Sequence, residues 1–474
     1  MDFTSKWLSL ALYQIGISTD PGQVVIGREG WLFLGDNYKQ SQTVSRRGKT
    51  SDDLIIGQKI GDATIAWDHW LASKGVRLFR VMIGPNKETI YPEYLPMWAK
   101  PSSPTATDAL LTGTGTQHYI DLREPLLAAK TSSNESLYYH TDTHWNSLGA
   151  GVAYRAFAQE VSRSIPEIRW PVDDAFEVSS IGPRYGGDLA NFLRISENLH
   201  DMEPVLNATN LPIETTQYDF DSRIIIHKGG NPQVGAPRKP VLIKSVGALN
   251  AKKVLWLRDS FGSALSPLMA ATFTETVQLH GGVALAPGGR FIELVEKWKP
   301  DYVFITVVER EARDELFATY PPISIIGQPG DFKQLRTTAP LVFNQILKGS
   351  ASNEYKLNGL DPFVVYTLSA PIEASEAQFL SINLVCRDNT EKVPMQLYWL
   401  KDGKSYFDEE NSMKFTVSSG LQLIDLRTVS GWAKSGTIHR LRLDSESQST
   451  CSEFKLSNPI IGVLPNHQYG FNSK

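Results

Sequence analysis

Short apolar runs alternate with helical patterns over the first part of the chain. The runs are rich in Val, Ile, Leu and aromatic residues, which is typical of strands covered on both faces. They predict strands at 76–84, 118–122, 253–259, 274–280 and 301–308. The stretches between them predict helices at 51–75, 124–130, 147–164, 262–273 and 290–299. This alternation predicts an α/β domain in which helices flank a mainly parallel sheet.

The pattern changes near residues 320–350. From there on, short runs with partial alternation recur between Asp-Gly, Ser-Gly and Asn turns. This pattern is typical of an antiparallel β-sandwich or jelly roll. We therefore expect one domain over residues 1–325 and a second over residues 345–474, joined by a Pro- and Gly-containing linker around 321–332.

The overall charge and composition exclude several classes of protein. The 47 basic and 51 acidic residues give a net charge of -4, so no basic surface is expected to hold nucleic acid. Apolar residues at 41% exclude wholesale disorder, and two cysteines exclude a disulfide framework. No apolar run is long enough to span a bilayer. The first 16 residues lack the cationic start of a signal peptide and instead predict a short amphipathic helix.

The segment YYHTDTHWNSLGAG (138–151) is the first candidate for chemistry. Asp142 and His144 lie two residues apart, just before a helix that Asn146 or Ser147 could cap. In extended chain such residues point to the same side, so the carboxylate can orient the imidazole for proton transfer. The alternatives are an ordinary capped helix start, or a metal site in which His140 joins Asp142 and His144 as ligands.

The segment KVLWLRDSFGSALSPL (253–268) is the second candidate. An apolar strand ends at Arg258-Asp259, and Ser260 precedes a helix. A serine in this position would stand at the carboxyl edge of the sheet, where backbone N–H groups could stabilise an oxyanion. The alternative is that Ser260 or Asp259 only caps the helix, since the G-x-S-x-G nucleophile elbow is absent.

Two further loops carry polar or glycine residues at expected strand ends. Asn86 and Lys87 follow the strand predicted at 76–84, where Asn86 could donate to an oxyanion and Lys87 could bind an anion. Gly186 and Gly187 would permit close backbone approach. A surface loop and a simple turn are the respective alternatives.

Together these motifs resemble the SGNH-hydrolase-like polysaccharide O-acetyltransferases of the alginate acetylation (AlgX/AlgJ) type. The matching segments occur in the family's order between about residues 20 and 310, and they are VVIGREGWLFLGDN (24–37), GPNKETIYPEYLP (84–96), YYHTDTHWNSLGA (138–150), RYGGDLA (184–190) and LRDSFGSALSP (257–267). The resemblance implies an SGNH-hydrolase-like catalytic domain that carries a Ser-His-Asp triad.

Carried over residue by residue, the resemblance makes Ser260 the nucleophile, His144 the general base and Asp142 its orienting partner. Arg258-Asp259-Ser260 departs from the Gly-Asp-Ser of the wider superfamily, so the usual glycine oxyanion donor is replaced. The Ser260 N–H and a group from the Asn86 or Gly186 loop are expected to act instead. The wider set of oxyanion or substrate-binding candidates is Asn86, Lys87, Gly186, Gly187, Arg258 and Tyr139.

The resemblance also implies partners and a location. It implies a periplasmic or secreted protein, anchored through a segment absent from this chain, that acts on an exopolysaccharide. An acetyl donor would be co-substrate, delivered by a membrane-bound O-acyltransferase, with no cofactor or metal. The β-rich tail would be a carbohydrate-binding module, and in the oxidising periplasm Cys386 and Cys451 could be bonded or free. Its candidate sugar-stacking aromatics, a type that more often lies in the core of a small sandwich, are Tyr398, Trp399, Tyr406, Phe407 and Trp432.

Several functions fit this reading. The first is an O-acetyltransferase that acetylates polysaccharide hydroxyls through an acetyl-serine intermediate. The second is a carbohydrate acetylesterase, because the same triad can pass the acetyl group to water. The third is a non-catalytic polysaccharide-binding scaffold. A metal-dependent hydrolase that uses His140, Asp142 and His144 is a fourth.

Overall fold

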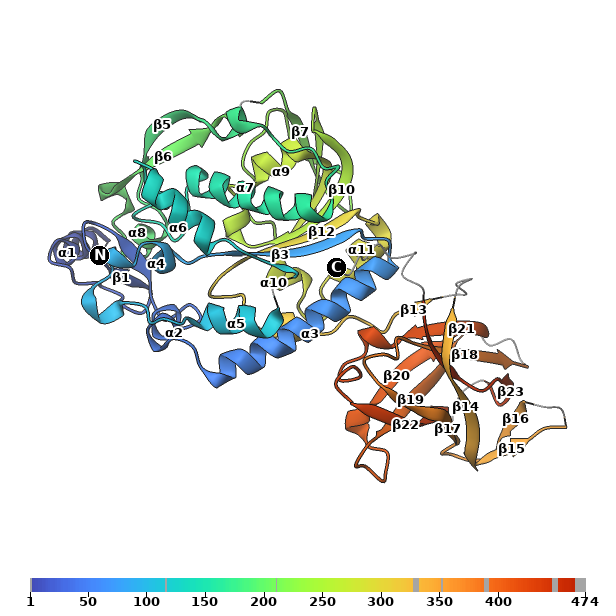
Figure 1. The fold of residues 1–474 in the computed structure, drawn as a ribbon. Helices are drawn as coiled ribbons and strands as arrows, with labels where there is room; N and C mark the ends of the chain where they lie inside the picture. The colour runs from blue at the N-terminus through green and yellow to red at the C-terminus, as the bar shows by residue number, and fades with distance from the viewer. Residues whose placement is uncertain are drawn as a thin grey trace. The chain divides into compact units, whose positions relative to one another are not determined.

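The computed structural model describes residues 2–115, 117–209, 211–326, 332–350, 353–387, 392–445 and 451–464. The chain divides into two compact units, drawn as ribbons in Figure 1. The first comprises residues 1–64 and 74–319, and the second comprises residues 65–73 and 320–474. Within the predicted linker, positions 327–331 lie outside the described residues.

A mixed eight-stranded sheet forms the centre of the first unit (Figure 1). Five neighbouring strands run parallel, and they are β4 (Tyr119–Asp121), β3 (Leu78–Gly84), β12 (Tyr302–Val308), β10 (Asn250–Arg258) and β11 (Phe273–His280). These correspond to the five predicted strands. Strand β12 is buried along its whole length, as its continuous apolar sequence requires.

Three further strands correct the prediction of a parallel sheet. They extend the sheet beyond β11 in antiparallel order, and they are β9 (Val241–Val246), β7 (Glu214–Asp219) and β8 (Ile225–Lys228). Strand β7 is polar in sequence, with Thr215 and Gln217 buried, and every residue of β8 is exposed. A search for continuous apolar runs misses β7 for this reason, whereas the short apolar run of β9, residues 241–243, was not recognised as a strand.

Helices cover both faces of the sheet. In Figure 1, α6 and α7 lie on one face, and α5 and α10 lie on the other. The α-helices are α1 (Asp2–Gln14), α2 (Ser41–Arg47), α3 (Ser51–Ser73), α4 (Lys87–Ile90), α5 (Ala106–Thr114), α6 (Arg123–Ser132), α7 (Ser147–Ser164), α8 (Asp188–Phe192), α9 (Ser266–Thr272), α10 (Gly281–Ala284) and α11 (Phe291–Trp298). Two small antiparallel pairs complete the unit, β1 (Val24–Ile26) with β2 (Leu32–Leu34) and β5 (Val178–Tyr185) with β6 (His200–Leu206).

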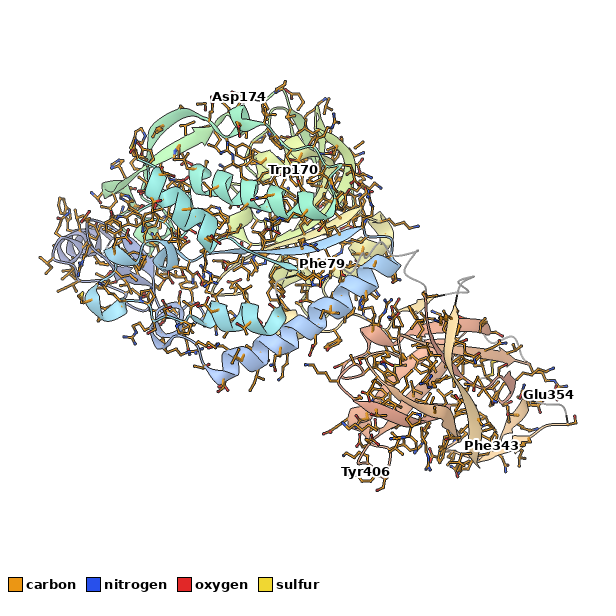
Figure 2. The ribbon with its side chains drawn as sticks, in the orientation of Figure 1. Phe79, Trp170, Asp174, Phe343, Glu354 and Tyr406 are labelled. Carbon is orange, nitrogen blue, oxygen red and sulfur yellow. A yellow bond between two sulfur atoms is a disulfide. The ribbon has the colours of Figure 1, made fainter. Side chains whose placement is uncertain are left out.

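Aromatic side chains fill the space between the sheet and α7. Phe157 of α7 packs edge-on against Phe304 of β12, with ring centroids 4.9 Å apart. Trp170, labelled in Figure 2, packs edge-on against Phe157 at 5.6 Å. This core fixes α7 on the sheet, and therefore also fixes the loop from which α7 begins.

The parallel strands end together at one edge of the sheet. Arg258, the last residue of β10, is paired with Thr306 of β12 and with His280 of β11. Gly84, the last residue of β3, is paired with Val308 of β12. Because the carboxyl ends are aligned, the loops that follow β3, β10 and β12 meet at the edge where α/β proteins form their sites.

The second unit is a large antiparallel sheet. Its strands are β13 (Ile325–Ile326), β14 (Lys333–Asn344), β15 (Ile346–Lys348), β16 (Glu354–Leu357), β17 (Phe363–Glu373), β18 (Phe379–Cys386), β19 (Val393–Lys401), β20 (Ser412–Val417), β21 (Gly420–Asp425), β22 (Thr437–Ser445), β23 (Glu453–Leu456) and β24 (Ile460–Val463). The first part of β14 pairs with β24 and its second part with β17, so β14 joins two halves of the sheet. The predicted all-β character is confirmed, and the jelly-roll topology stays a prediction.

One apolar core serves both halves of this sheet. It includes Leu380 and Ile382 of β18 together with Leu397 of β19 and Leu441 of β22. Cys386 at the end of β18 is bonded to Cys451, a pairing that the sequence left open. Across the described part of the chain, no helix is long and apolar enough to cross a membrane.

Candidate active site

The three residues proposed as a triad form one chain of contacts. His144 Nε2 lies 2.7 Å from Ser260 Oγ, and His144 Nδ1 lies 2.6 Å from Asp142 Oδ1. Ser260 is exposed, whereas Asp142 is buried. A nucleophile in contact with a base, which is itself held by a carboxylate, is the arrangement that activates serine for acyl transfer.

The turn that carries Ser260 is held by Asp259. The Asp259 carboxylate accepts hydrogen bonds from Phe261 N at 2.9 Å and from Val308 N at 2.6 Å. It thereby caps the short 3-10 helix Ser260–Gly262 and ties it to the end of β12. The backbone N–H of Ser260 makes no hydrogen bond to any described residue. That N–H is therefore free to donate to a ligand.

The loop that carries His144, here called the histidine loop, is held where it leads into α7. Asn146 caps α7, its side-chain oxygen accepting from Leu148 N and Gly149 N. Trp145 donates from Nε1 to the Phe261 carbonyl at 2.9 Å, and the two rings lie 4.9 Å apart. This contact joins the histidine loop to the serine turn, which sets the distance between His144 and Ser260.

Lys87 supports the histidine loop and does not face a substrate. Its ammonium donates to the backbone carbonyls of Tyr139 at 3.0 Å, His140 at 3.0 Å and Asp142 at 2.6 Å. Burial lowers the pKa of Lys87 to about 8, although the negative charge of Asp142 acts in the opposite direction. The role of anion ligand expected for Lys87 is therefore corrected, because its three donors are used inside the protein.

Gly186 and Gly187 lie close to the triad as expected, but their N–H groups are hydrogen-bonded elsewhere in the protein. Gly186 N donates to the carbonyls of Ser196 and Leu199, and Gly187 N donates to Thr141 Oγ1 at 2.9 Å. A Cβ atom on Gly187 would lie 2.6 Å from Asp142 Cγ. Gly187 therefore serves to admit the Asp142 side chain, and the oxyanion role of this loop is corrected.

Arg258 is a structural residue. Its side chain is fully buried, and the guanidinium donates to Gln278 Oε1 at 2.8 Å and to the carbonyl of Val234 at 2.6 Å. Further donors reach the carbonyls of Gly235 and Asp259. Burial lowers the pKa of Arg258 to about 9. With its donors engaged inside, Arg258 braces the turn before Ser260 and does not bind substrate.

Asn86 and Tyr139 have different surroundings. Asn86 N donates to Glu309 Oε2 at 2.9 Å, and its Oδ1 accepts from Arg310 at 3.2 Å. The Asn86 Nδ2 group has no partner in the part of the chain that the structure describes. Tyr139 donates from its hydroxyl to Glu203 at 2.6 Å and is buried. Asn86 thus keeps a free donor, whereas the Tyr139 hydroxyl is already used.

Two charged residues near the triad were not predicted. Asp188, at the start of α8, accepts from Thr143 N at 2.8 Å and Thr143 Oγ1 at 2.5 Å, and its Oδ2 lies 3.7 Å from His144 Nδ1. Arg184 of β5 lies 3.4 Å from Asp142 Oδ2. Both belong to the RYGGDLA segment, whose polar residues were the available signal, but only the fold brings them to the triad.

The local charges raise the basicity of His144. Burial disfavours the imidazolium, but the hydrogen bond and charge of Asp142 outweigh it and raise the pKa of His144 above its ordinary value. Asp188 acts in the same direction through its charge. The Asp142 pKa is held below its usual range, because the bond to His144 and the charge of Arg184 overcome its burial.

The structure corrects the alternative in which His140, Asp142 and His144 together bind a metal ion. His140 stacks on Trp31 at 4.3 Å and contacts Ser136 Oγ at 3.3 Å. Asp188, in place of His140, completes a group of possible ligand atoms with Asp142 and His144. Both imidazole nitrogens of His144 are already engaged within the triad, which favours proton transfer over metal binding.

Residues 24–224 match the family model of the SGNH hydrolase-like domain of acetyltransferase AlgX. The resemblance inferred from the sequence is therefore confirmed for this segment. The AlgX-type match includes Asp142 and His144 and ends before Ser260. The assignment of Ser260 to the same site consequently depends on the distances given above.

Curated proteins similar to this chain include probable alginate O-acetylases. The chain is 30% identical over 203 residues to the probable alginate O-acetylase AlgJ of Pseudomonas putida, which covers 42% of this chain and 48% of the relative. The AlgJ of Pseudomonas aeruginosa is 26% identical over 217 residues, with the same shares. The chain thus spans about half the length of the curated relatives it matches.

Two solved structures of the same kind are also similar. The O-acetyltransferase domain of Pseudomonas putida AlgJ has 22% identity and a TM-score of 0.40, over 61% of this chain and 92% of that structure. Pseudomonas aeruginosa AlgX has 13% identity and a TM-score of 0.37, over 94% of this chain and 96% of that structure.

Outside the AlgX-type segment, the aromatic candidates of the second unit separate into core and surface. Trp399 and Trp432 are each 1% exposed and pack edge-on at 5.1 Å, so their expected role as sugar contacts is wrong. Tyr398 is 8% exposed and donates to Glu409 at 2.6 Å, and Phe407 packs against it. Tyr406 is 62% exposed and stands at the rim of this unit in Figure 2.

Proposed function

We propose that this protein transfers an acetyl group to a hydroxyl of a polysaccharide through an acetyl-serine intermediate. The contact chain Asp142–His144–Ser260 carries the proposal, because it leaves an exposed hydroxyl beside a basic imidazole. The similarity to alginate O-acetylases supports the acyl group and the acceptor class. Alginate is therefore the first acceptor to test.

The proposed chemistry has two steps. Ser260 Oγ attacks the acetyl carbonyl carbon of an ester donor while its proton passes to His144 Nε2. The bond from the acetyl carbon to the donor oxygen then breaks, and that oxygen takes the proton from His144. In the second step, a sugar hydroxyl gives its proton to His144 and attacks the acetyl-serine. Ser260 leaves and recovers the proton, so His144 ends each cycle neutral.

The developing oxyanion needs donors at the same edge of the sheet. The free N–H of Ser260 is one, and the unpartnered Nδ2 group of Asn86 is the other that we propose. Arg310 donates to Asn86 Oδ1 and therefore leaves the amide nitrogen as the group available to a ligand. Loss of one such donor typically costs ~10²–10³-fold in rate.

The second unit and the cellular setting complete the proposal. We assign the antiparallel unit to polysaccharide binding, with Tyr406 as the exposed aromatic that could stack on a sugar ring. The Cys386–Cys451 bond supports an oxidising compartment such as the periplasm. Delivery of the acetyl group by a membrane-bound O-acyltransferase, with no cofactor or metal, remains part of the proposal.

Hydrolysis of p-nitrophenyl acetate tests the triad. Ser260→Ala and His144→Ala should each lower kcat/KM by at least ~10³-fold, because neither variant can form an activated nucleophile. Ser263→Ala, three residues further along the same turn, is the matched control and should retain activity. Full activity in both triad variants would contradict the assignment, and an inactive wild-type protein would favour the scaffold hypothesis.

Mass spectrometry of the acceptor separates transferase from esterase. An oligosaccharide incubated with protein and acetyl donor should gain the mass of acetyl groups if sugar hydroxyls are the acceptor. An acetylated oligosaccharide that instead loses acetyl groups, with no gain in the first reaction, would establish the esterase alternative. Both reactions should disappear in Ser260→Ala.

A further inference from the structure

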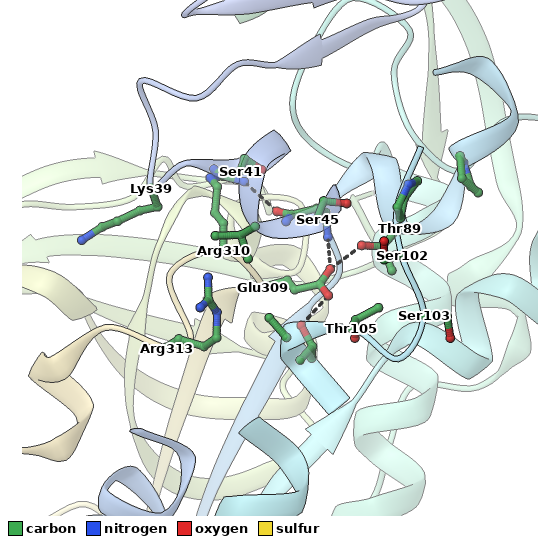
Figure 3. A pocket seen from close by; sticks show the side chains of 16 residues that line it. Lys39, Ser41, Ser45, Thr89, Ser102, Ser103, Thr105, Glu309, Arg310 and Arg313 are labelled. Atoms are coloured by element: carbon green, nitrogen blue, oxygen red, sulfur yellow. Dashed lines mark hydrogen bonds between the residues drawn. The ribbon is translucent and has the colours of Figure 1, made fainter. Parts of the chain in front are cut away.

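A pocket of about 230 Å³ lies at the carboxyl edge of the sheet in the first unit (Figure 3). Its walls come from the loops after β3 and β12, from α2 and from the segment before α5. Its polar lining combines hydroxyls with cationic side chains, including Ser45, Ser103, Thr89, Lys39, Arg310 and Arg313. The volume is below that typical of drug-sized ligands, and it suits one sugar unit.

Arg310 connects this pocket with the surroundings of the proposed nucleophile. The guanidinium carbon of Arg310 lies 5.9 Å from the ring centre of Phe261, the residue after Ser260. Arg310 also donates to Asn86, the proposed oxyanion donor, and its charge acts on His144. The triad residues do not line the pocket, but Asn86 and Arg310 belong both to its wall and to the surroundings of the triad.

Most charges in the pocket wall are already compensated. Arg313 is bound to Asp53 at 2.6 Å, and Lys39 is bound to Asp314 at 2.5 Å. The Glu309 carboxylate accepts from Asn86 N, Thr89 Oγ1 and Thr107 Oγ1, as Figure 3 shows in part. Lys39 and Arg313 each have a carboxylate partner, although Arg313 shares Asp53 with Arg47.

Arg310 is the exception. Its one hydrogen bond within the described residues goes to the neutral Asn86 Oδ1, and no described carboxylate lies within ion-pair distance. The side chain is partly exposed to the pocket. An arginine retains five donors in a planar fork that matches a carboxylate, so most of this capacity is unused. The hydroxyls of Ser45 and Ser103 also lack a described partner.

We propose that this pocket binds an acidic sugar unit of the acceptor, with Arg310 as the residue that selects its carboxylate. The free hydroxyls of Ser45 and Ser103 would bond to hydroxyls of the same sugar. The proposal rests on the proposed function, in which a polysaccharide hydroxyl must reach the acetyl-serine. Binding the neighbouring carboxylate would hold the acceptor sugar in register with Ser260.

Acceptor selectivity tests the proposal. The two acceptors are a hexuronate oligomer and the same oligomer with each carboxylate converted to a carboxamide, which adds no new hydroxyl. We expect the wild-type protein to prefer the acid, and Arg310→Gln to lower the acid-to-amide ratio of kcat/KM by roughly 10- to 100-fold. Arg310→Lys should lower the ratio less, because it keeps the charge and loses the fork.

Lys39→Gln is the matched control. It removes one positive charge from the same pocket wall, but from a lysine already paired with Asp314. The selectivity ratio should change less than about threefold, as expected for an exposed ion pair. An equal effect in Lys39→Gln and Arg310→Gln would overturn the assignment to Arg310, because the pocket's overall field would then account for the selectivity. An unchanged ratio in Arg310→Gln, with both acceptors slowed equally, would overturn it as well and restrict Arg310 to positioning Asn86.

A second measurement does not require transfer. In Ser260→Ala protein, phenylglyoxal modification of Arg310 is followed by peptide mass spectrometry. The hexuronate should slow this modification by at least ~10-fold, and the carboxamide should not. Equal rates with and without the hexuronate would refute the proposal. Protection of Arg310 in a protein that acetylates neither acceptor would instead retain the binding site and reject the proposed function.

Discussion

Substituting Gly187 with alanine should disable the triad without touching any of its members. The backbone of Gly187 has φ of −78°, a conformation open to any residue, so alanine adds no conformational strain. The cost is steric. The new Cβ atom would lie 2.6 Å from Asp142 Cγ and closer still to the Cβ and Oδ2 atoms of the same side chain.

The expected magnitude follows from these contacts. An ordinary contact between such atoms is at least 3.4 Å, so the carboxylate must move by about 1 Å. The Asp142–His144 bond, now 2.6 Å, would lengthen beyond hydrogen-bond range or lose its alignment. A misplacement of this size in a catalytic array costs ~10²-fold in rate. We therefore expect kcat/KM on p-nitrophenyl acetate to fall by about 10²-fold.

Gly182→Ala is the matched control for this experiment. Gly182 lies on β5, five residues before Gly187, and a Cβ atom there would meet nothing within 4 Å. It should retain wild-type activity. Thermal unfolding should show both variants folded at the assay temperature. A folded Gly187→Ala protein within threefold of wild-type activity would refute the view that close packing on Asp142 sets the triad geometry.

Four further predictions concern pH and stability. The raised pKa of His144 should place the acid limb of kcat/KM above pH 6.5, since the protonated base is inactive. Asp188→Asn removes a charge that raises this pKa, so the limb should move to lower pH; an unmoved limb would contradict the role of Asp188. Lys87→Met leaves three carbonyls without their donor. It should lower the free energy of unfolding, measured in urea, by about 3 kcal/mol. An unchanged free energy of unfolding would show that water replaces the ammonium. Cys386→Ser opens a loop of 65 residues and should destabilise the second unit by about 4 kcal/mol relative to the disulfide-bonded wild-type protein, whereas the reduced wild-type protein should be as unstable as the variant.

Local patterns were sufficient for much of the fold. The apolar runs predicted β3 and β12 because both strands are covered on two faces. The helix α7 was predicted with its observed bounds, and Asn146 caps it as the sequence indicated. The contact between Asp142 and His144 was also predictable, because only one residue separates them and the backbone alone brings their side chains together.

The edge strands and the aromatics of the second unit show where local patterns fail. Strand β7 has no apolar run, and the isoleucines of β8 are exposed and form only a short run. Trp399 and Trp432 look like sugar-binding residues in the sequence, but both lie in the core. Side-chain type does not reveal which face of a sheet a residue occupies, and a shift of one residue would reverse it.

The sequence by itself determined the α/β and all-β halves, the polar residues at strand ends and the local pairing of Asp142 with His144. The tertiary structure decided which distant residues share the site. Ser260 and His144 are 116 positions apart in the sequence. Their side chains come into contact because the end of β10 and the start of α7 lie at the same edge of the packed sheet. The same packing turned Lys87 inward to hold the histidine loop, brought Asp188 to the triad and left Arg310 without a carboxylate. These outcomes depend on burial and on the charges of remote segments, and neither is encoded in the spacing of neighbouring residues.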